Sequence, residues 1–465
     1  MYDVGGIPTT HDILMKLSLI TTIYQHMCDV RACLLQFRDF AKNLIANTCY
    51  LFKWAWRSIA VASILVVTGE WQPANAQQKP GVRQASNSSD YSGILGFGLI
   101  SVMDSDEKSI VRSPRSRTWV DSEYVLWSLS HYSVPALVTS SSPATPPNLA
   151  GLLNSRTTTT LLGSEFGHDS LSGFRFGMGG WLEDCDGSSF EVYYTGLPEQ
   201  GSQTTFNNVK SPVLARPVFD TTLGAEAANL VAYPNVLSGS LTVNGSATLH
   251  LIDAIFRDPV FKSKCSKLDA IFGFRFGALD ESLSIEQNSR YLIGQGQILN
   301  GTTKSIVDQF DTRNRFYGAI AGLDYRERFG GSEVFFRVAT AYGMNQRDVN
   351  INGKTINTVP GGGSATFNGG LLAQVTNIGD YSDTKMIVVP EISVRLLRKL
   401  SPQWQFNIGY SLLYWDNAAR PGPQIDRRVS QYPPESAMGS GNPTFTFENS
   451  SVLIYGWQTG LLFTF

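Results

Sequence analysis

Long apolar stretches are almost absent from this chain of 465 residues. Past residue 76 there is no run of about 18 or more apolar residues, which argues against a protein that crosses a membrane with helices. Charge is also scarce, since Asp, Glu, Lys and Arg make up 16% of the chain and roughly 25% is usual in soluble domains. Low charge without apolar helices is typical of a transmembrane β-barrel, in which alternation dilutes the apolar residues. The net charge of −2 gives no reason to expect nucleic acid as a partner.

Cysteine is the second scarce residue. Of the five cysteines, Cys28, Cys33 and Cys49 lie in a segment that we expect to be removed, so that only Cys185 and Cys265 remain. Two cysteines are too few for a disulfide-rich scaffold or a structural zinc site. Both fall in predicted turns, and the sequence leaves open whether they are bonded. We expect no metal and no cofactor.

The front of the chain resembles a secretory signal. Lys53 and Arg57 precede the short apolar segment 59–67, and Ala74-Asn75-Ala76 follows it, a pattern that predicts cleavage after Ala76. A membrane anchor is the alternative, but the apolar run is short for one. Whether the true start codon lies further along stays open. Three parts follow: a signal peptide with a long n-region (1–76), a flexible periplasmic linker (77–116) and an outer-membrane β-barrel (117–465).

The last segment, Val452 to Phe465, indicates how the barrel closes. Its residues alternate strictly, with Leu453, Tyr455 and Trp457 on one face, which predicts a strand. An aromatic strand at an open sheet edge would invite aggregation, and closure into a barrel removes that edge. A terminal Phe is also how outer-membrane barrels end, so we expect Phe465 to act as an assembly signal. The expected partners are outer-membrane lipid and the barrel-assembly machinery.

Ten alternating segments are predicted as strands, joined alternately by short turns and long loops. Short turns lie near Cys185, Pro259, Gly330 and Ser401, and the long connections are rich in Gly, Pro, Ser and Asn. This habit predicts an all-β, antiparallel transmembrane barrel with short periplasmic turns, long extracellular loops and both termini in the periplasm. The predicted strands are 117–128, 171–182, 188–197, 240–256, 266–285, 315–328, 333–349, 385–398, 403–415 and 451–465, and the predicted loops are 129–170, 198–239, 286–314, 350–384 and 416–450. The fourth strand is interrupted by Gly239 and Gly245, so a bend is expected there.

Several short motifs carry a family resemblance. They occur, in order, at 121–127 (DSEYVLW), 215–220 (ARPVFD), 310–316 (FDTRNRF), 388–392 (VVPEI), 413–415 (LYW) and 420–427 (RPGPQIDR). On these residues the segment 119–465 resembles the Putative beta barrel porin-7 family of outer-membrane proteins. The resemblance implies an outer-membrane barrel. It implies no reaction and no catalytic residues.

Charged residues recur on the faces that we expect to point inward. A ten-stranded barrel is only slightly wider than one that side chains fill, so opposite charges on neighbouring strands, such as Glu123 and Arg175, would pair across the lumen. The alternative is a selectivity ring. The candidate lumen-lining charges are Asp121, Glu123, Arg175, Glu191, Asp269, Arg275, Asp324, Arg326, Arg337, Glu391 and Arg395.

A second charged set lies in the predicted loops. These residues either form salt bridges that fold the loops over the barrel or create an anion-binding mouth, because Arg suits bidentate contacts to carboxylate and phosphate. The set comprises Arg216, Asp220, Asp311, Arg313, Arg420, Asp426 and Arg427.

The function favoured by the sequence is a porin-like outer-membrane barrel, a narrow pore for small solutes. The alternative is a closed structural or surface-binding barrel that acts through its extracellular loops. An outer-membrane protease-like enzyme is a distant third reading, since His168-Asp169 lies where some ten-stranded barrels carry catalytic Asp and His groups. No second carboxylate pair accompanies it, so we expect no enzyme. The sequence does not name a solute or an oligomeric state.

Overall fold

The computed structural model describes residues 118–182, 187–435 and 441–465. The predicted signal peptide, the predicted linker and Cys185 therefore lie outside the described residues. Cys265 is exposed in the turn that follows residue 262.

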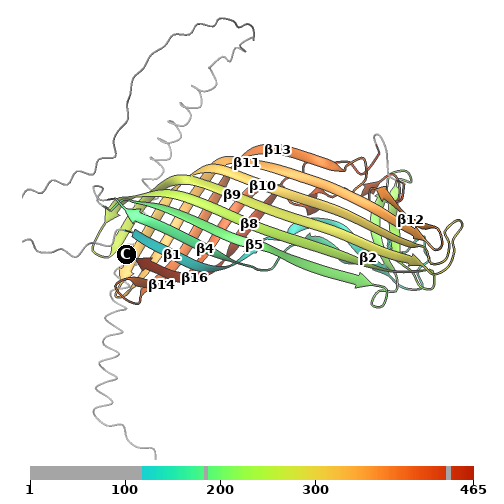
Figure 1. Cartoon of the computed structure of the whole chain (residues 1–465), viewed down its shortest axis with the longest axis horizontal. Coiled ribbons are helices and arrows are strands. Elements are labelled where there is room, and N and C mark those ends of the chain that lie inside the picture. Colours follow the sequence, from blue (N-terminus) through green and yellow to red (C-terminus); the bar gives the residue numbers. More distant parts are fainter. Residues whose placement is uncertain (1–117, 183–186, 436–440) are drawn as a thin grey trace, which may run out of the picture. The chain divides into compact units, whose positions relative to one another are not determined.

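Ten strands form a closed antiparallel ring in the described part of the chain (Figure 1). Each pairs with the next along the ring, and Trp119 lies opposite Thr464 where the last strand meets the first. The predicted ten-stranded barrel is therefore confirmed. In chain order the ring contains β1 (Thr118–Leu129), β4 (Leu171–Trp181), β5 (Ser189–Asn207), β8 (Leu237–Lys262), β9 (Ser266–Tyr291), β10 (Thr303–Phe329), β11 (Ser332–Val359), β13 (Gly379–Lys399), β14 (Trp404–Ala418) and β16 (Ser450–Thr464).

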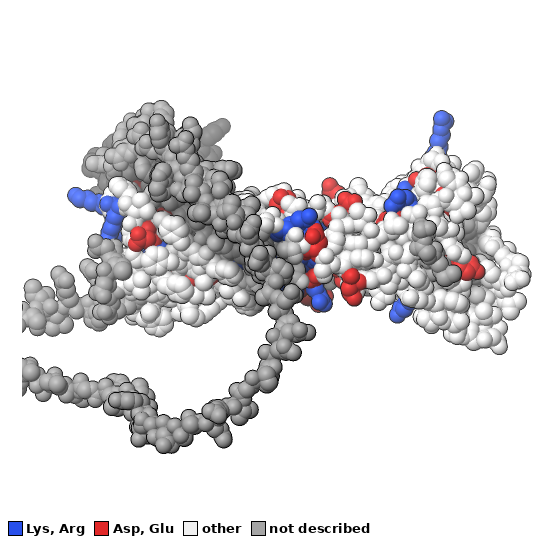
Figure 2. Space-filling model, turned by 90° about the horizontal axis from the view of Figure 1, so that it is seen from above, with Lys and Arg blue, Asp and Glu red and all other residues white. Residues whose placement is uncertain are grey.

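Alternation gives the ring an apolar outer face. On β9, Phe272 and Phe274 are exposed while the flanking Ile271 and Arg275 are buried inside. A band of exposed apolar side chains around a closed ring is the lipid-facing surface of a transmembrane barrel. The same outward apolar set includes Tyr124, Leu126, Phe174, Phe176, Met178, Phe336, Val338, Tyr342, Met386, Val388, Ile392, Val394, Trp404, Phe406 and Ile408. On the face seen in Figure 2, charges gather in a band partway along the barrel and at its ends.

The short and long connections lie at opposite ends of the barrel, as predicted. Residues 263–265, 330–331 and 400–403 make short turns at one end, where β1 begins and β16 finishes. Four strands, β8 to β11, run for 26 to 28 residues, whereas about 9–11 residues suffice to cross a bilayer. The ring therefore continues beyond its lipid-facing band as a wall at the long-loop end.

Three of the predicted loops are shorter than expected, because strands continue into 198–239, 286–314 and 350–384. Asp311 and Arg313, predicted as loop residues, lie on β10. Outward-facing residues in these extensions are mostly polar or charged rather than apolar, so the apolar alternation that reveals a strand is largely missing there.

The long connections build a second sheet of their own at the long-loop end of the barrel. It contains β2 (Tyr132–Ser141), β3 (Thr158–Phe166), β6 (Leu214–Asp220), β7 (Ala225–Ala232) and β15 (Arg428–Val429), in the order β15-β6-β2-β3 with β7 on β6. We call it the loop sheet. The remaining elements are β12 (Gly363–Asn368), a hairpin strand on β11, and the short 3₁₀ helix η1 (Gly422–Gln424). No helix in the described residues is long and apolar enough to cross a membrane.

Two glycines of β8 allow the loop sheet to approach the wall closely. A Cβ at Gly245 would lie 2.3 Å from the ring of Phe166 on β3, and one at Gly239 would lie 2.2 Å from the carbonyl oxygen of Val231 on β7. The strand pairs with β9 through both glycines without a register shift. These glycines, expected to mark a bend, are needed because any larger side chain would push the loop sheet away.

The terminal residue generates the first prediction. The Phe465 amide donates a hydrogen bond to the Thr118 carbonyl (2.9 Å), and its ring packs edge-on against Phe463 with 4.8 Å between centroids. Phe465→Asp should cost only about 0–1 kcal/mol of folding free energy near an interface. We expect the variant to refold into detergent yet to insert poorly in cells, as measured by heat-modifiable gel migration.

The conservative variant Phe465→Tyr is the control and should insert normally. Normal insertion of Phe465→Asp in cells would remove the assembly role of the residue. Failure in both settings would instead make Phe465 a requirement for folding.

Candidate functional site: the filled lumen and the loop sheet

Ion pairs fill the barrel interior toward the short-turn end. Arg337 of β11 donates two hydrogen bonds of 2.8 Å to Asp324 of β10, and neither side chain is exposed. Arg275 of β9 donates to Asp253 of β8 at 2.6 and 2.8 Å and also to Glu391 of β13. Both bidentate pairs join neighbouring strands at positions directly opposite in the register, whereas the contact between Arg275 and Glu391 links strands that are not neighbours in the ring and so crosses the lumen.

Further guanidinium groups complete this ionic layer. Arg257 donates to Glu191 at 2.6 and 2.9 Å and lies 2.5 Å from Asp324. Arg395 reaches Glu123 at 3.2 Å. Arg175, which stands opposite Glu123 in the register of β1 and β4, is 4.0 Å from the same carboxylate.

Phe335 lies among the cations of the ionic layer. Four guanidinium carbons lie between 4.8 and 5.7 Å from its ring centroid, those of Arg257, Arg326, Arg337 and Arg395. The ring itself is buried. Cations at such distances are attracted to the ring face, so the centre of the layer is occupied by an aromatic side chain and the groups around it.

The ionic layer contains nearly equal numbers of acids and bases. All eleven lumen candidates from the sequence lie on the inner face, and Arg326 is the most exposed of them, with 29% of its side chain accessible at the short-turn end. Asp253, Arg257, Lys267 and Glu333 belong to the layer but were missed. The eight acids are Asp121, Glu123, Glu191, Asp253, Asp269, Asp324, Glu333 and Glu391, and the seven bases are Arg175, Arg257, Lys267, Arg275, Arg326, Arg337 and Arg395. Charges of both signs alternate and pair inside the barrel, so they do not form a ring of one sign.

An apolar layer follows the ionic one along the barrel. All ten strands of the ring contribute buried side chains to one cluster, in which Trp415 packs edge-on against Phe316 with 6.0 Å between ring centroids. Gly277 lies beneath the Trp415 ring, where a Cβ would approach within 2.9 Å. The indole therefore fills space that any other residue at position 277 would take.

The third layer is the loop sheet, which packs on the inner face of the extended wall. Leu214 and Val218 of β6 share an apolar cluster with Leu241, Leu283 and others from β8 to β11. This cluster closes the long-loop end of the barrel. Apolar contact of this kind supplies most of the stabilisation of such an interface.

Asp308 of β10 holds the loop sheet to the wall. Its carboxylate is fully buried and accepts a hydrogen bond from Arg216 of β6 at 2.6 Å. The backbone amides of Leu372 and Ala373 each donate to its other oxygen at 2.8 Å. One carboxylate on the wall thus binds two long connections at once.

A second buried pair anchors the last long connection. Arg420 donates two hydrogen bonds to Glu281 of β9, at 2.8 and 2.6 Å, and a third to the Ser130 carbonyl at 2.6 Å. Its guanidinium also lies 4.7 Å from the centroid of the Tyr132 ring. Each of its three nitrogens thus donates to the protein, and the side chain is buried.

Arg427 and Asp220 also have partners within the protein. Arg427 pairs with Glu226 at 3.1 Å. Asp220 accepts from the backbone amides of Thr222 and Leu223, at 2.8 and 2.9 Å, and from the Tyr432 hydroxyl at 3.2 Å. Burial, and then the Asp220 carboxylate, raise the pKa of Tyr432 to about 12.

Asp426 and the two candidates on β10 complete the set. Burial raises the pKa of Asp426, but hydrogen bonds from Arg428 and Thr444 outweigh it and leave that pKa below its usual value. Asp311 and Arg313 lie beside a hollow on the outer face of the wall, away from Arg216 and Arg420. The structure therefore does not bring the loop arginines together into one mouth.

His168 and Asp169 line one hollow together with His131 and Glu165, and Asp169 is paired with His131 rather than with His168. His168 is buried, and burial is the main reason that its pKa lies below the ordinary value. Asp169 is exposed and lies 3.2 Å from the imidazole of His131, whose other nitrogen is 3.8 Å from Glu165. The adjacent residues noted in the sequence therefore do not form a hydrogen-bonded pair with each other.

The closed ring, its apolar outer band and its ten-stranded antiparallel topology define a porin-like β-barrel membrane protein. The chain belongs to the Putative beta barrel porin-7 family, whose model matches residues 119–465. No curated protein matches this sequence.

Similar solved structures are outer-membrane proteins of low sequence identity. The outer membrane protease OmpT from Escherichia coli is 8% identical, with 77% of this chain and 100% of that chain covered and a TM-score of 0.34. A Pseudomonas aeruginosa FadL homologue is 9% identical, with 76% of this chain and 90% of that chain covered and a TM-score of 0.20. An anion-selective porin from Comamonas acidovorans is 11% identical, with 74% of this chain and 100% of that chain covered and a TM-score of 0.17. At these TM-scores the likenesses carry no inference about this chain.

The buried anchor generates a prediction about stability. Arg216→Ala leaves the Asp308 carboxylate buried without its cation, and breaking a buried pair in this way costs roughly 3–5 kcal/mol. Urea unfolding in detergent should show that loss, and hydrogen exchange should rise first in 208–236. The matched control is Arg427→Ala, whose pair is partly exposed and should cost about 0–1 kcal/mol. Equal losses in the two variants would contradict the anchoring role of Asp308.

Proposed function

We propose that this protein is a closed outer-membrane barrel that acts through the loop sheet and the wall at its long-loop end. The occlusion of the lumen carries the proposal: a layer of paired charges, an apolar layer with side chains from all ten strands, and the loop sheet follow one another along the axis. A solute would have to displace each in turn. The narrow pore is the competing function, and the buried Trp415 and Phe335 rings weigh against it.

The proposed orientation places the short turns and both barrel termini in the periplasm. Short turns on that side are the rule for bacterial outer-membrane barrels. The long-loop end, with its polar outer surface, then faces the exterior of the cell. A structural or binding role suits this end, since its charged side chains are mostly engaged in internal pairs that hold a fixed shape. We propose no enzymatic activity.

Ion conductance separates the closed barrel from the pore. The mature protein, refolded and inserted into planar bilayers, should show no single-channel steps above the leak of the lipid. Insertion is verified in the same bilayers by protection of the barrel from added protease. Discrete steps whose ion selectivity changes in Arg337→Gln would overturn the proposal, because only a conducting path through the ionic layer could respond to that substitution.

A further inference from the structure

The wall beyond the lipid-facing band has a polar outer face. Outward side chains of β8 change from Phe256 and Ile252, which are exposed and apolar, to Asn244, Thr242 and Ser240 further toward the long-loop end. Since alternate residues of one strand share a face, the change marks the level at which the outer surface ceases to suit lipid. Beyond this level, the outer face of β8 is polar and faces water or other polar groups rather than lipid tails.

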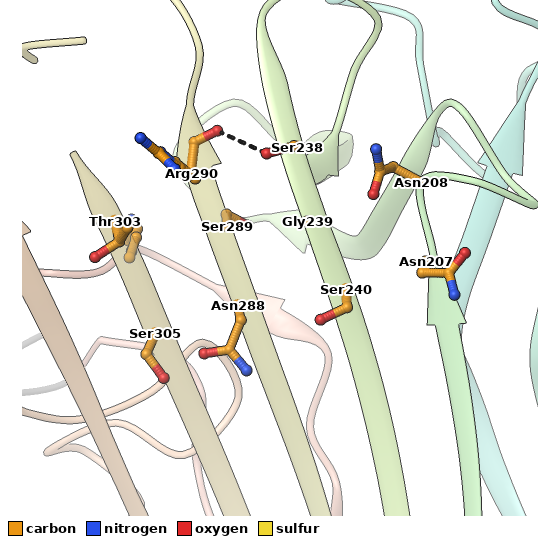
Figure 3. A pocket seen from close by; sticks show the side chains of 11 residues that line it. Asn207, Asn208, Ser238, Gly239, Ser240, Asn288, Ser289, Arg290, Thr303 and Ser305 are labelled. Carbon is orange, nitrogen blue, oxygen red and sulfur yellow. Dashed lines mark hydrogen bonds between the residues drawn. The ribbon is translucent and has the colours of Figure 1, made fainter. Parts of the chain in front are cut away.

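A hollow of about 510 Å³ lies at the far end of this polar face (Figure 3). Four side chains cross it in one row, each directly opposite the next in the strand register: Asn207 of β5, Ser240 of β8, Asn288 of β9 and Ser305 of β10. With strands about 4.8 Å apart the row extends over roughly 14 Å. It therefore offers a line of amides and hydroxyls rather than a single contact point.

The row differs from the polar rows beneath it in having free hydrogen-bonding groups. Lower on the wall, Gln203 donates to Asn244 at 2.8 Å, and Asn244 donates to Glu286 at 3.2 Å. In the hollow, the side chains of Ser240, Asn288 and Ser305 have no hydrogen-bond partner among the described residues. Each hydroxyl can donate and accept, and the amide offers two donors and an acceptor. These groups are available to an external ligand.

The charge of the lining narrows the ligand class. A second row contains Ser238, Arg290 and Thr303, in register with one another. The Arg290 side chain is exposed, and the lining contains no carboxylate and no aromatic or large apolar side chain. The lining therefore offers no apolar contacts for the apolar side chains of a peptide. A hydroxyl-rich ligand that carries a carboxylate or phosphate would match both the neutral row and the guanidinium.

We propose that this hollow binds a polysaccharide chain with acidic substituents, whose hydroxyls contact the Asn207–Ser305 row and whose anionic group pairs with Arg290. The inference rests on the proposed function in one respect, namely that the long-loop end faces outward. Two sources share this chemistry: sugar chains of the surrounding lipopolysaccharide, and free extracellular polysaccharide. A sugar chain from either source would lie along the Asn207–Ser305 row, across the strands.

Calorimetric titration of the whole mature protein in detergent tests the proposal. The probes are smooth lipopolysaccharide, deep-rough lipopolysaccharide that lacks the long sugar chain, alginate as a free acidic polysaccharide, and dextran as a neutral one. The double variant Ser240→Ala/Asn288→Ala should raise the Kd of the bound polysaccharide roughly tenfold. Arg290→Gln should weaken the binding of alginate more than the binding of dextran. Asn352→Ala, an exposed amide on the outer face of β11 outside the hollow, is the matched control and should bind as the native protein does.

Binding of smooth but not deep-rough lipopolysaccharide, without alginate, would support the proposal and assign the membrane source. Binding of alginate alone would support it and assign the free source. No binding of any sugar chain, or equal binding by the double variant and Asn352→Ala, would overturn it. The titration requires no closed lumen, so its failure would leave the closed barrel intact, and a conducting barrel that still bound alginate would leave this proposal intact.

Discussion

The buried carboxylate of Asp308 is the interaction on which the closed end of this barrel depends. It is placed by β10, yet its partners come from the connection between β5 and β8 and from the one between β11 and β13. A charge that is fully buried is tolerated only when its lone pairs are satisfied. The wall and the two connections are therefore formed together, and the loop sheet cannot leave the wall without exposing an unpaired carboxylate to an apolar cluster.

The same constraint operates along the whole lumen. A ring of ten strands encloses too much space to be left empty and too little for a wide channel. The chain fills it near the short turns with paired charges around Phe335, then with apolar rings such as Trp415, and finally with the loop sheet. The outer surface is apolar in the lipid-facing band and polar further toward the long-loop end. Inner packing and outer chemistry are thus independent, because alternate residues belong to different faces.

Strand number, closure and the sorting of loops could be predicted from the sequence because they depend on local alternation and turn residues. The extensions of β8 to β11 could not, since their outward residues are polar and their alternation is hidden. Asp253 and Arg257 share the parity of Leu251 and Ile255 on β8, a signal that would have placed them inside. The partner of Arg216 is set by the fold alone, since Asp308 is 92 positions away and Asp220 is nearer in sequence.

Access of water-soluble reagents to the apolar layer tests the filled lumen most directly. Ala341→Cys places a thiol on the inner face of β11, in a background in which Cys185 and Cys265 are serine, and Asn352→Cys places one on the outer face of the same strand. A charged methanethiosulfonate reagent should modify Asn352→Cys rapidly and Ala341→Cys only after unfolding. Rapid modification of Ala341→Cys in the folded barrel would show an aqueous path through the layer and would contradict the account.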